Sequence, residues 1–93
     1  MEANGYSIRT PAEIGTFIRV VRIASNLTQA EAAALSGVGG PFLSDLEGGK
    51  RTAQLGPTLA VCHSLGIEIR LAAPVAVDDA RTRKRRTRRP RAT

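Results

Sequence analysis

Residues 10–66 are divided into four short helical segments by residues that start and stop helices, and this division constrains the fold more than any other feature. Two segments begin with a Thr-x-x-Glu capping box, at Thr10 and at Thr28. The other two begin at or beside a proline, which suits the first turn of a helix, and a glycine closes three of the four. We expect an all-α bundle of four to five helices, in which the first helix starts at 11 and stops near 25–26 and three others cover 29–35, 40–47 and 57–65.

The chain has to be stabilised by packing, because it offers neither a disulfide nor a metal site. It has 93 residues with one cysteine and one histidine, and these two residues do not have metal-ligand spacing. Chains this short bury a modest share of their surface, so they are stable when compactly helical or oligomeric. We interpret Cys62 as a core thiol beside a surface imidazole, His63, and we expect no metal and no other cofactor.

The sequence pattern changes from helical to alternating after residue 66. Apolar residues then occupy every second position, which predicts a half-buried strand that ends before Pro74: Ile67, Ile69 and Leu71. A lone strand leaves its edge uncovered, and the simplest cover is the same strand of a second copy, antiparallel across a two-fold axis. We therefore expect a homodimer joined by one C-terminal β-strand from each chain.

Charge divides the chain into a slightly acidic body and a strongly basic tail. Eight of the 14 Lys and Arg residues lie within 81–91, which has no acid. Residues 1–80 hold the other six basic residues and all eight acidic ones, so they carry a formal charge of −2. We expect a flexible arm over 1–9, one domain over 10–73 and a disordered basic tail over 74–93. The tail has three readings: a clamp on DNA phosphates, a contact with an acidic partner, or a solvated extension.

Three segments between residues 27 and 51 resemble the phage-repressor-like helix-turn-helix family, also called Cro/C1 or XRE. They match the start of that family's second helix, its turn, and its third helix with the following loop: 27–31 (LTQAE), 36–38 (SGV) and 43–51 (LSDLEGGKR). The segment 65–71 (LGIEIRL), directly after the fourth helix, looks like the HipB-type antitoxins. That resemblance implies a dimeric repressor of its own operon that also neutralises a kinase-like toxin.

The resemblance also assigns residues to a DNA interface. Thr28 and Gln29 would contact a phosphate, since helix starts attract anions; alternatively Thr28 is only a cap and Gln29 is solvated. The third helix would enter the major groove of operator DNA with five outward positions facing the bases: Gly39, Gly40, Pro41, Ser44 and Asp45. Lys50 and Arg51 would contact phosphates or, alternatively, form a solvated turn.

Two further roles follow from the same resemblance. Phe42 would contact a thymine methyl group or, equally, belong to the core. Arg22 would pair with Glu47 and tie the first helix to the third. The base-facing positions include no Arg, Gln or Asn, the residue types that make bidentate contacts with guanine or adenine. We therefore expect sparse direct readout, with more weight on DNA shape and backbone contacts.

The leading functional hypothesis is a sequence-specific DNA-binding repressor with an antitoxin role. The alternative is a protein-interaction module on a helix-turn-helix fold that lacks specific DNA binding, which the acidic body and the sparse base-reading residues support. An enzyme is not expected, because the sequence has no Ser/His/Asp set and no phosphate-cradling glycine loop. No segment has the roughly 18 apolar residues of a membrane span and no signal-peptide pattern is present. We therefore expect a cytoplasmic protein without a membrane partner, nucleoid-associated when bound to DNA.

Overall fold

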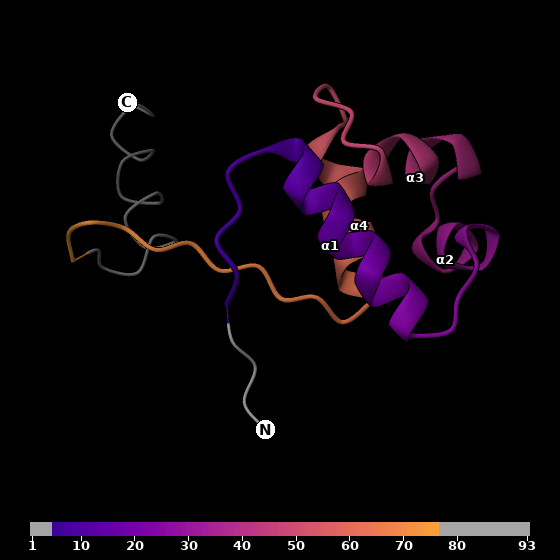
Figure 1. Ribbon diagram of the computed structural model, residues 1–93, viewed down its shortest axis with the longest axis horizontal. Coiled ribbons are helices and arrows are strands. Elements are labelled where there is room, and N and C mark those ends of the chain that lie inside the picture. Colours follow the sequence, from indigo (N-terminus) through magenta and orange to yellow (C-terminus); the bar gives the residue numbers. More distant parts are fainter. Residues whose placement is uncertain (1–4, 77–93) are drawn as a thin grey trace, which may run out of the picture.

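Four α-helices follow one another in residues 5–76, the part of the chain that the computed structural model describes (Figure 1). They are α1 (Pro11–Ala24), α2 (Gln29–Ser36), α3 (Gly40–Glu47) and α4 (Leu55–Ser64). The four predicted helices are therefore confirmed, and residues 5–76 contain no fifth one. Helix α4 begins two residues before Pro57, the residue expected to start it, because Gln54 provides the extended N-cap conformation.

Both predicted capping boxes are formed. The Thr10 hydroxyl accepts a hydrogen bond from the Glu13 N–H at 3.2 Å, and the Glu13 carboxylate accepts from the Thr10 N–H at 3.1 Å. Thr28 and Glu31 make the same two bonds at 3.1 and 2.9 Å. Each box satisfies backbone donors that a helix start would otherwise leave free. The start positions of α1 and α2 are therefore set by residues only three positions apart.

The core is formed mainly by large aliphatic side chains from three helices, with small residues between them. Ile18, Leu43 and Val61 are fully buried and come from α1, α3 and α4. Helix α2 contributes Ala32 and Ala33, whose short side chains let it pack against both α3 and α4. Cys62 also lies in this cluster, and burial raises the pKa of its thiol. It is a core residue, as the sequence indicated.

Helix α1 packs against α3 through Gly15, a glycine that no turn or helix-end signal in the sequence marks. A β-carbon at Gly15 would overlap the Leu46 carbonyl oxygen and lie 2.9 Å from that of Glu47. Only glycine therefore lets the backbone of α1 approach the last turn of α3 this closely. The approach brings the end of α3 within reach of side chains from α1.

The segment after α4 differs from the expectation. Within residues 5–76 no strand is formed, and 67–73 has no regular secondary structure. A β-ladder needs a second strand, and the described part of this chain does not supply one. Ile67 packs against the core, whereas Ile69 is half-exposed and Leu71 is 95% exposed. The predicted pairing across a dimer therefore stays a prediction.

The two ends of the described chain lie on the side of the bundle away from α2 and α3 (Figure 1). Residues 5–9 have no regular secondary structure, but the ring of Tyr6 contacts that of Phe17 on α1, with centroids 5.1 Å apart. The part of the basic tail beyond residue 76 lies outside the described residues. No helix within 5–76 is long and apolar enough to cross a membrane.

Candidate nucleic-acid interface

A tight turn joins α2 to α3 and holds the two helices as one unit. Gly37 ends α2 in the left-handed conformation, with φ of 72°, which a residue with a side chain rarely adopts. The next residue, Val38, donates its N–H to the Ala33 carbonyl at 3.0 Å and packs its side chain against the core. The relative orientation of α2 and α3 is therefore set by one glycine and one apolar anchor.

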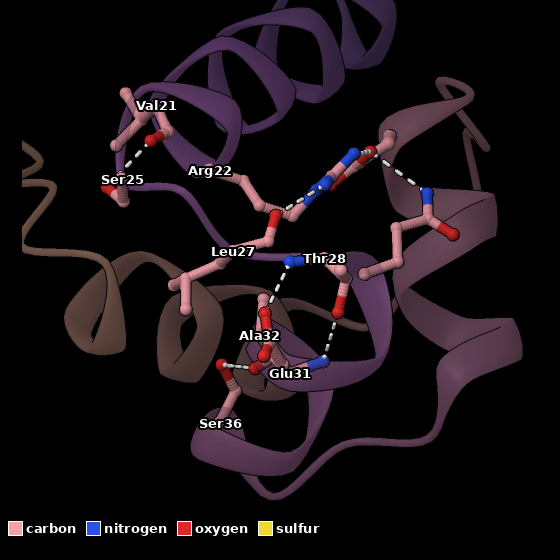
Figure 2. Close-up of polar contacts among 10 residues, drawn as sticks. Val21, Arg22, Ser25, Leu27, Thr28, Glu31, Ala32 and Ser36 are labelled. Atoms are coloured by element: carbon pink, nitrogen blue, oxygen red, sulfur yellow. Dashed lines mark hydrogen bonds and ion pairs between the residues drawn. The ribbon is translucent and has the colours of Figure 1, made fainter.

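Arg22 and Glu47, which were expected to pair, form a bidentate ion pair between α1 and α3. The Arg22 Nε donates to Glu47 Oε2 at 2.6 Å and the Arg22 Nη2 donates to Glu47 Oε1 at 3.0 Å. The two side chains are 10% and 3% exposed. A third guanidinium bond runs from Nη1 to the Leu27 carbonyl at 2.8 Å (Figure 2). Arg22 thus connects α1 to the end of α3 and to the residues that lead into α2.

Gln29 joins the same network, which the sequence did not indicate. Its amide nitrogen, Nε2, donates to Glu47 Oε1 at 3.0 Å. Glu47 therefore accepts hydrogen bonds from α1 and from the first residue of α2 while itself being the last residue of α3. Gln29 is half-buried, so its side chain is only partly exposed to solvent, and its expected phosphate contact stays a prediction.

The surroundings of Glu47 change the pKa of its carboxyl group, and this change can be tested. Burial by itself would raise the pKa of the carboxyl group, but the hydrogen bonds from Arg22 and Gln29 and the charges of Arg22 and Arg19 outweigh it. The net effect lowers the pKa of Glu47 below its ordinary value of 4.5. The folded protein therefore holds this proton less tightly than the unfolded chain does.

This lowered pKa predicts acid sensitivity. A group whose folded pKa is depressed stabilises the fold above its unfolded pKa, and that stabilisation is lost as the pH falls toward the folded pKa. We expect the free energy of unfolding of the full chain to decline as the pH drops below 4.5. Urea titrations at a series of pH values would measure this decline. It should be smaller in Glu47→Gln, and an equal decline in both proteins would contradict the assignment to Glu47.

The residues expected to face DNA bases all lie at the surface, on α3 or directly before it. Their side chains or backbone are exposed: Gly39, Gly40, Pro41, Ser44 and Asp45. Phe42, in contrast, is half-buried and packs against the core, which favours its core reading. The start of α3 also differs from those of α1 and α2, because no side chain caps it. The first turn of α3 is thus an exposed surface with very few side-chain atoms.

The other residues expected at the interface lie in the loop after α3 and at the start of α2. Lys50 and Arg51 are exposed in the loop after α3, and the Lys50 Nζ lies 3.4 Å from Asp45 Oδ2. Both partners of that pair are about half-exposed, so the pair contributes little stability and opens readily. The Thr28 hydroxyl serves as the cap of α2, as the cap reading required. Among the described residues, no three or more side chains of the types Cys, His, Asp and Glu lie together so that they could hold a metal ion.

The sequence of this chain matches a known protein family and is similar to a known bacterial protein. The family described as "Helix-turn-helix domain" matches residues 13–84. An uncharacterized HTH-type transcriptional regulator, y4mF of Sinorhizobium fredii, is 51% identical over 67 residues, 72% of this chain and 88% of that protein.

Solved structures give the same fold. HipB, in an O4 20mer complex and in a HipA-HipB-O2-O3 complex, matches with a TM-score of 0.69 and 21% identity, over 76% of this chain and 100% of that chain. The restriction-modification controller protein C.AhdI of Aeromonas hydrophila matches with a TM-score of 0.58 and 31% identity, over 62% of this chain and 88% of that one. The described residues and these structures thus have the helix-turn-helix arrangement in common.

Proposed function

This chain belongs to the XRE-type helix-turn-helix family, and from that premise we propose that it is a DNA-binding transcriptional regulator that represses its own operon. One observation carries the proposal most directly. The start of α2 and the first turn of α3 are both exposed, and the Arg22–Glu47–Gln29 network ties the elements that bear them together. Such a pair of rigid helices is what a major-groove reader requires.

Helix α3 is the proposed reading element. Ser44 can donate to or accept from a base edge, and Asp45 can accept from a cytosine amino group. Gly39, Gly40 and Pro41 offer no bidentate partner for guanine or adenine, so the helix backbone would come close to the DNA. Selectivity would then depend on groove shape and deformability more than on base-edge hydrogen bonds.

Phosphate contacts are proposed on both sides of α3. Thr28 and Gln29 at the start of α2 provide neutral donors and an exposed helix N-terminus. Lys50 and Arg51 provide cations, and each phosphate that a cation neutralises adds roughly 0.9 to the slope of log affinity against log salt concentration. The basic residues beyond residue 76 would add affinity without sequence information.

We also propose a homodimer and an antitoxin role. Ile69 and Leu71 are exposed in the single chain, and a strand pairing of Ile67, Ile69 and Leu71 with a second copy would cover them. The fold shared with HipB, which one structure contains together with HipA, supports a kinase-like toxin protein as the second partner. Light scattering tests the dimer, and a pull-down with the product of an adjoining kinase-like gene tests the toxin partner.

A binding titration tests the regulator itself. The full chain and a chain ending at Ala80 are titrated against DNA from upstream of this protein's coding sequence, with random-sequence DNA as competitor and at several salt concentrations. If the shorter chain still prefers the upstream DNA, the helix-turn-helix unit reads sequence and the tail only adds affinity. If neither chain prefers the upstream DNA, the proposal of a sequence-specific regulator is wrong. The alternative, a protein-interaction module without specific DNA binding, would then replace it; the net charge of −2 on residues 1–80 favours that alternative.

The two capping boxes provide a matched pair of variants. Thr10→Ala and Thr28→Ala each remove one side-chain cap, so each should lower the free energy of unfolding by about 1 kcal/mol. We expect only Thr28→Ala to weaken DNA binding as well, because α2 starts at the proposed phosphate contact and α1 does not. Thermal unfolding and the same titration measure both effects. Equal DNA affinities for the two variants would remove Thr28 from the interface.

A further inference from the structure

Gln29 has its amide group oriented before any DNA is bound. An ionised carboxylate only accepts hydrogen bonds, so the contact between Gln29 Nε2 and Glu47 Oε1 at 3.0 Å fixes which end of the amide faces Glu47. The amide nitrogen carries two protons, and Glu47 accepts one of them. The second N–H is left for another acceptor at the start of α2.

The acceptor that orients Gln29 is itself immobile. The Glu47 side chain is 3% exposed, and two hydrogen bonds from Arg22 hold its two oxygens. Arg22 in turn donates to the Leu27 carbonyl, two residues before Gln29. No buried side-chain nitrogen or oxygen atom in residues 5–76 lacks a partner. Within residues 5–76 the Gln29 side chain makes one hydrogen bond, to Glu47, so its second amide proton is not used by the network.

We propose that Glu47 is a positioning residue for DNA binding: it holds the Gln29 amide so that the second N–H can donate to a backbone phosphate. This inference rests on the proposed DNA-binding function and adds to it a division of roles within the network. Gln29 touches the phosphate, Glu47 orients Gln29, and Arg22 neutralises the Glu47 charge so that the carboxylate does not repel the phosphate.

Two physical effects favour this arrangement. A glutamine that is already held in one rotamer loses little conformational freedom when it binds, whereas a free one would have to be immobilised at that moment. The capping box uses the N–H groups of Thr28 and Glu31, whereas those of Gln29 and Ala30 at the helix N-terminus would attract the same anion as the side chain. The opposite possibility is that Glu47 competes with DNA for the amide, in which case releasing Gln29 would strengthen binding.

A double-mutant cycle in the full chain separates these possibilities. The variants are Gln29→Ala, Glu47→Gln and the double variant, titrated against a random-sequence duplex and against the upstream duplex. Phosphate contacts carry no sequence information, so the cycle is informative on random DNA even if the protein proves not to be a specific regulator. Glu68→Gln is the matched control, because it removes one acid from an exposed pair with Arg70, outside the network.

We expect Gln29→Ala to weaken binding about tenfold on both duplexes, as for a lost hydrogen bond to a charged group. Because the amide is neutral, the salt slope should stay unchanged. Glu47→Gln should weaken binding roughly three- to tenfold in the wild-type background. With alanine at position 29, it should have no larger effect than Glu68→Gln has. An equal loss in both backgrounds would mean that Glu47 acts only through stability, and tighter binding would mean that it competes with DNA; either result overturns the proposal.

Gln29→Asn keeps the test decisive if Glu47→Gln does not fold. Asparagine retains the amide but is one methylene shorter, so it cannot keep the contact with Glu47 and reach the same phosphate. We expect it to bind as weakly as Gln29→Ala. Wild-type affinity in Gln29→Asn would overturn the positioning role of Glu47. If the wild-type chain shows no preference for the upstream duplex, that result would overturn the proposed regulator function and not this inference.

Discussion

Glu47→Ala is expected to lower the free energy of unfolding by about 3 kcal/mol, because it leaves the Arg22 guanidinium without its buried partner. Arg22 Nε and Nη2 both lose their acceptors, and the side chain is 10% exposed, so water replaces them only in part. The Gln29 amide loses its acceptor as well. For a domain of this size the loss corresponds to roughly 12–24 °C in the midpoint of thermal unfolding. Circular dichroism against temperature, or against urea, measures it.

The control for this prediction is Glu68→Ala. Glu68 pairs with Arg70 at 3.3 Å, but the two side chains are 70% and 81% exposed, and such surface pairs contribute about 0–1 kcal/mol. A large loss in Glu47→Ala beside a small one in Glu68→Ala would assign the difference to burial. An unchanged unfolding midpoint in Glu47→Ala would show that the pair between α1 and α3 is not a structural link.

Gly15→Ala is expected to be comparably damaging, at about 3 kcal/mol, although it adds a single methyl group. That methyl would overlap the Leu46 carbonyl and press on that of Glu47 at 2.9 Å. Backbone atoms cannot rotate away as a flexible side chain can, so α1 and α3 would have to separate, and overpacking of this kind costs up to about 3 kcal/mol. The separation would also pull Arg22 away from Glu47. Chemical denaturation measures the loss.

Gly56→Ala is the matched control for this substitution. Gly56 also lies in a helix, in the first turn of α4, but a β-carbon there would meet nothing within 4 Å. Alanine is the better helix former, but its β-carbon would crowd the ring of the following residue, Pro57, so the net change should stay within about 1 kcal/mol in either direction. A large loss in Gly15→Ala beside a small change in Gly56→Ala would demonstrate that the contact at Gly15, and not glycine itself, matters. Similar values for both would refute the close approach of α1 to α3.

Local features of the fold were predictable from the sequence. The two capping boxes depend on residues three positions apart, Thr10 with Glu13 and Thr28 with Glu31, and both are formed. Gly37 stops α2 because its own φ is positive. The first turns of α2 and α3 could be located in the same way. These features are decided by short-range sterics and hydrogen bonds, which the identity of neighbouring residues is enough to specify.

Contacts between distant residues were decided only by the tertiary structure. Gln29 and Glu47 are 18 positions apart, and no spacing rule links a residue at a helix start to one at another helix end. Gly15 has no turn and no positive φ to reveal it; its importance arises only because α3 passes against it. The alternating pattern at Ile67, Ile69 and Leu71 indicated a strand, yet a strand needs a neighbour, and residues 5–76 of one chain contain none. Local signals set where helices begin and end, whereas packing decides which side chains meet, because it depends on all the elements together.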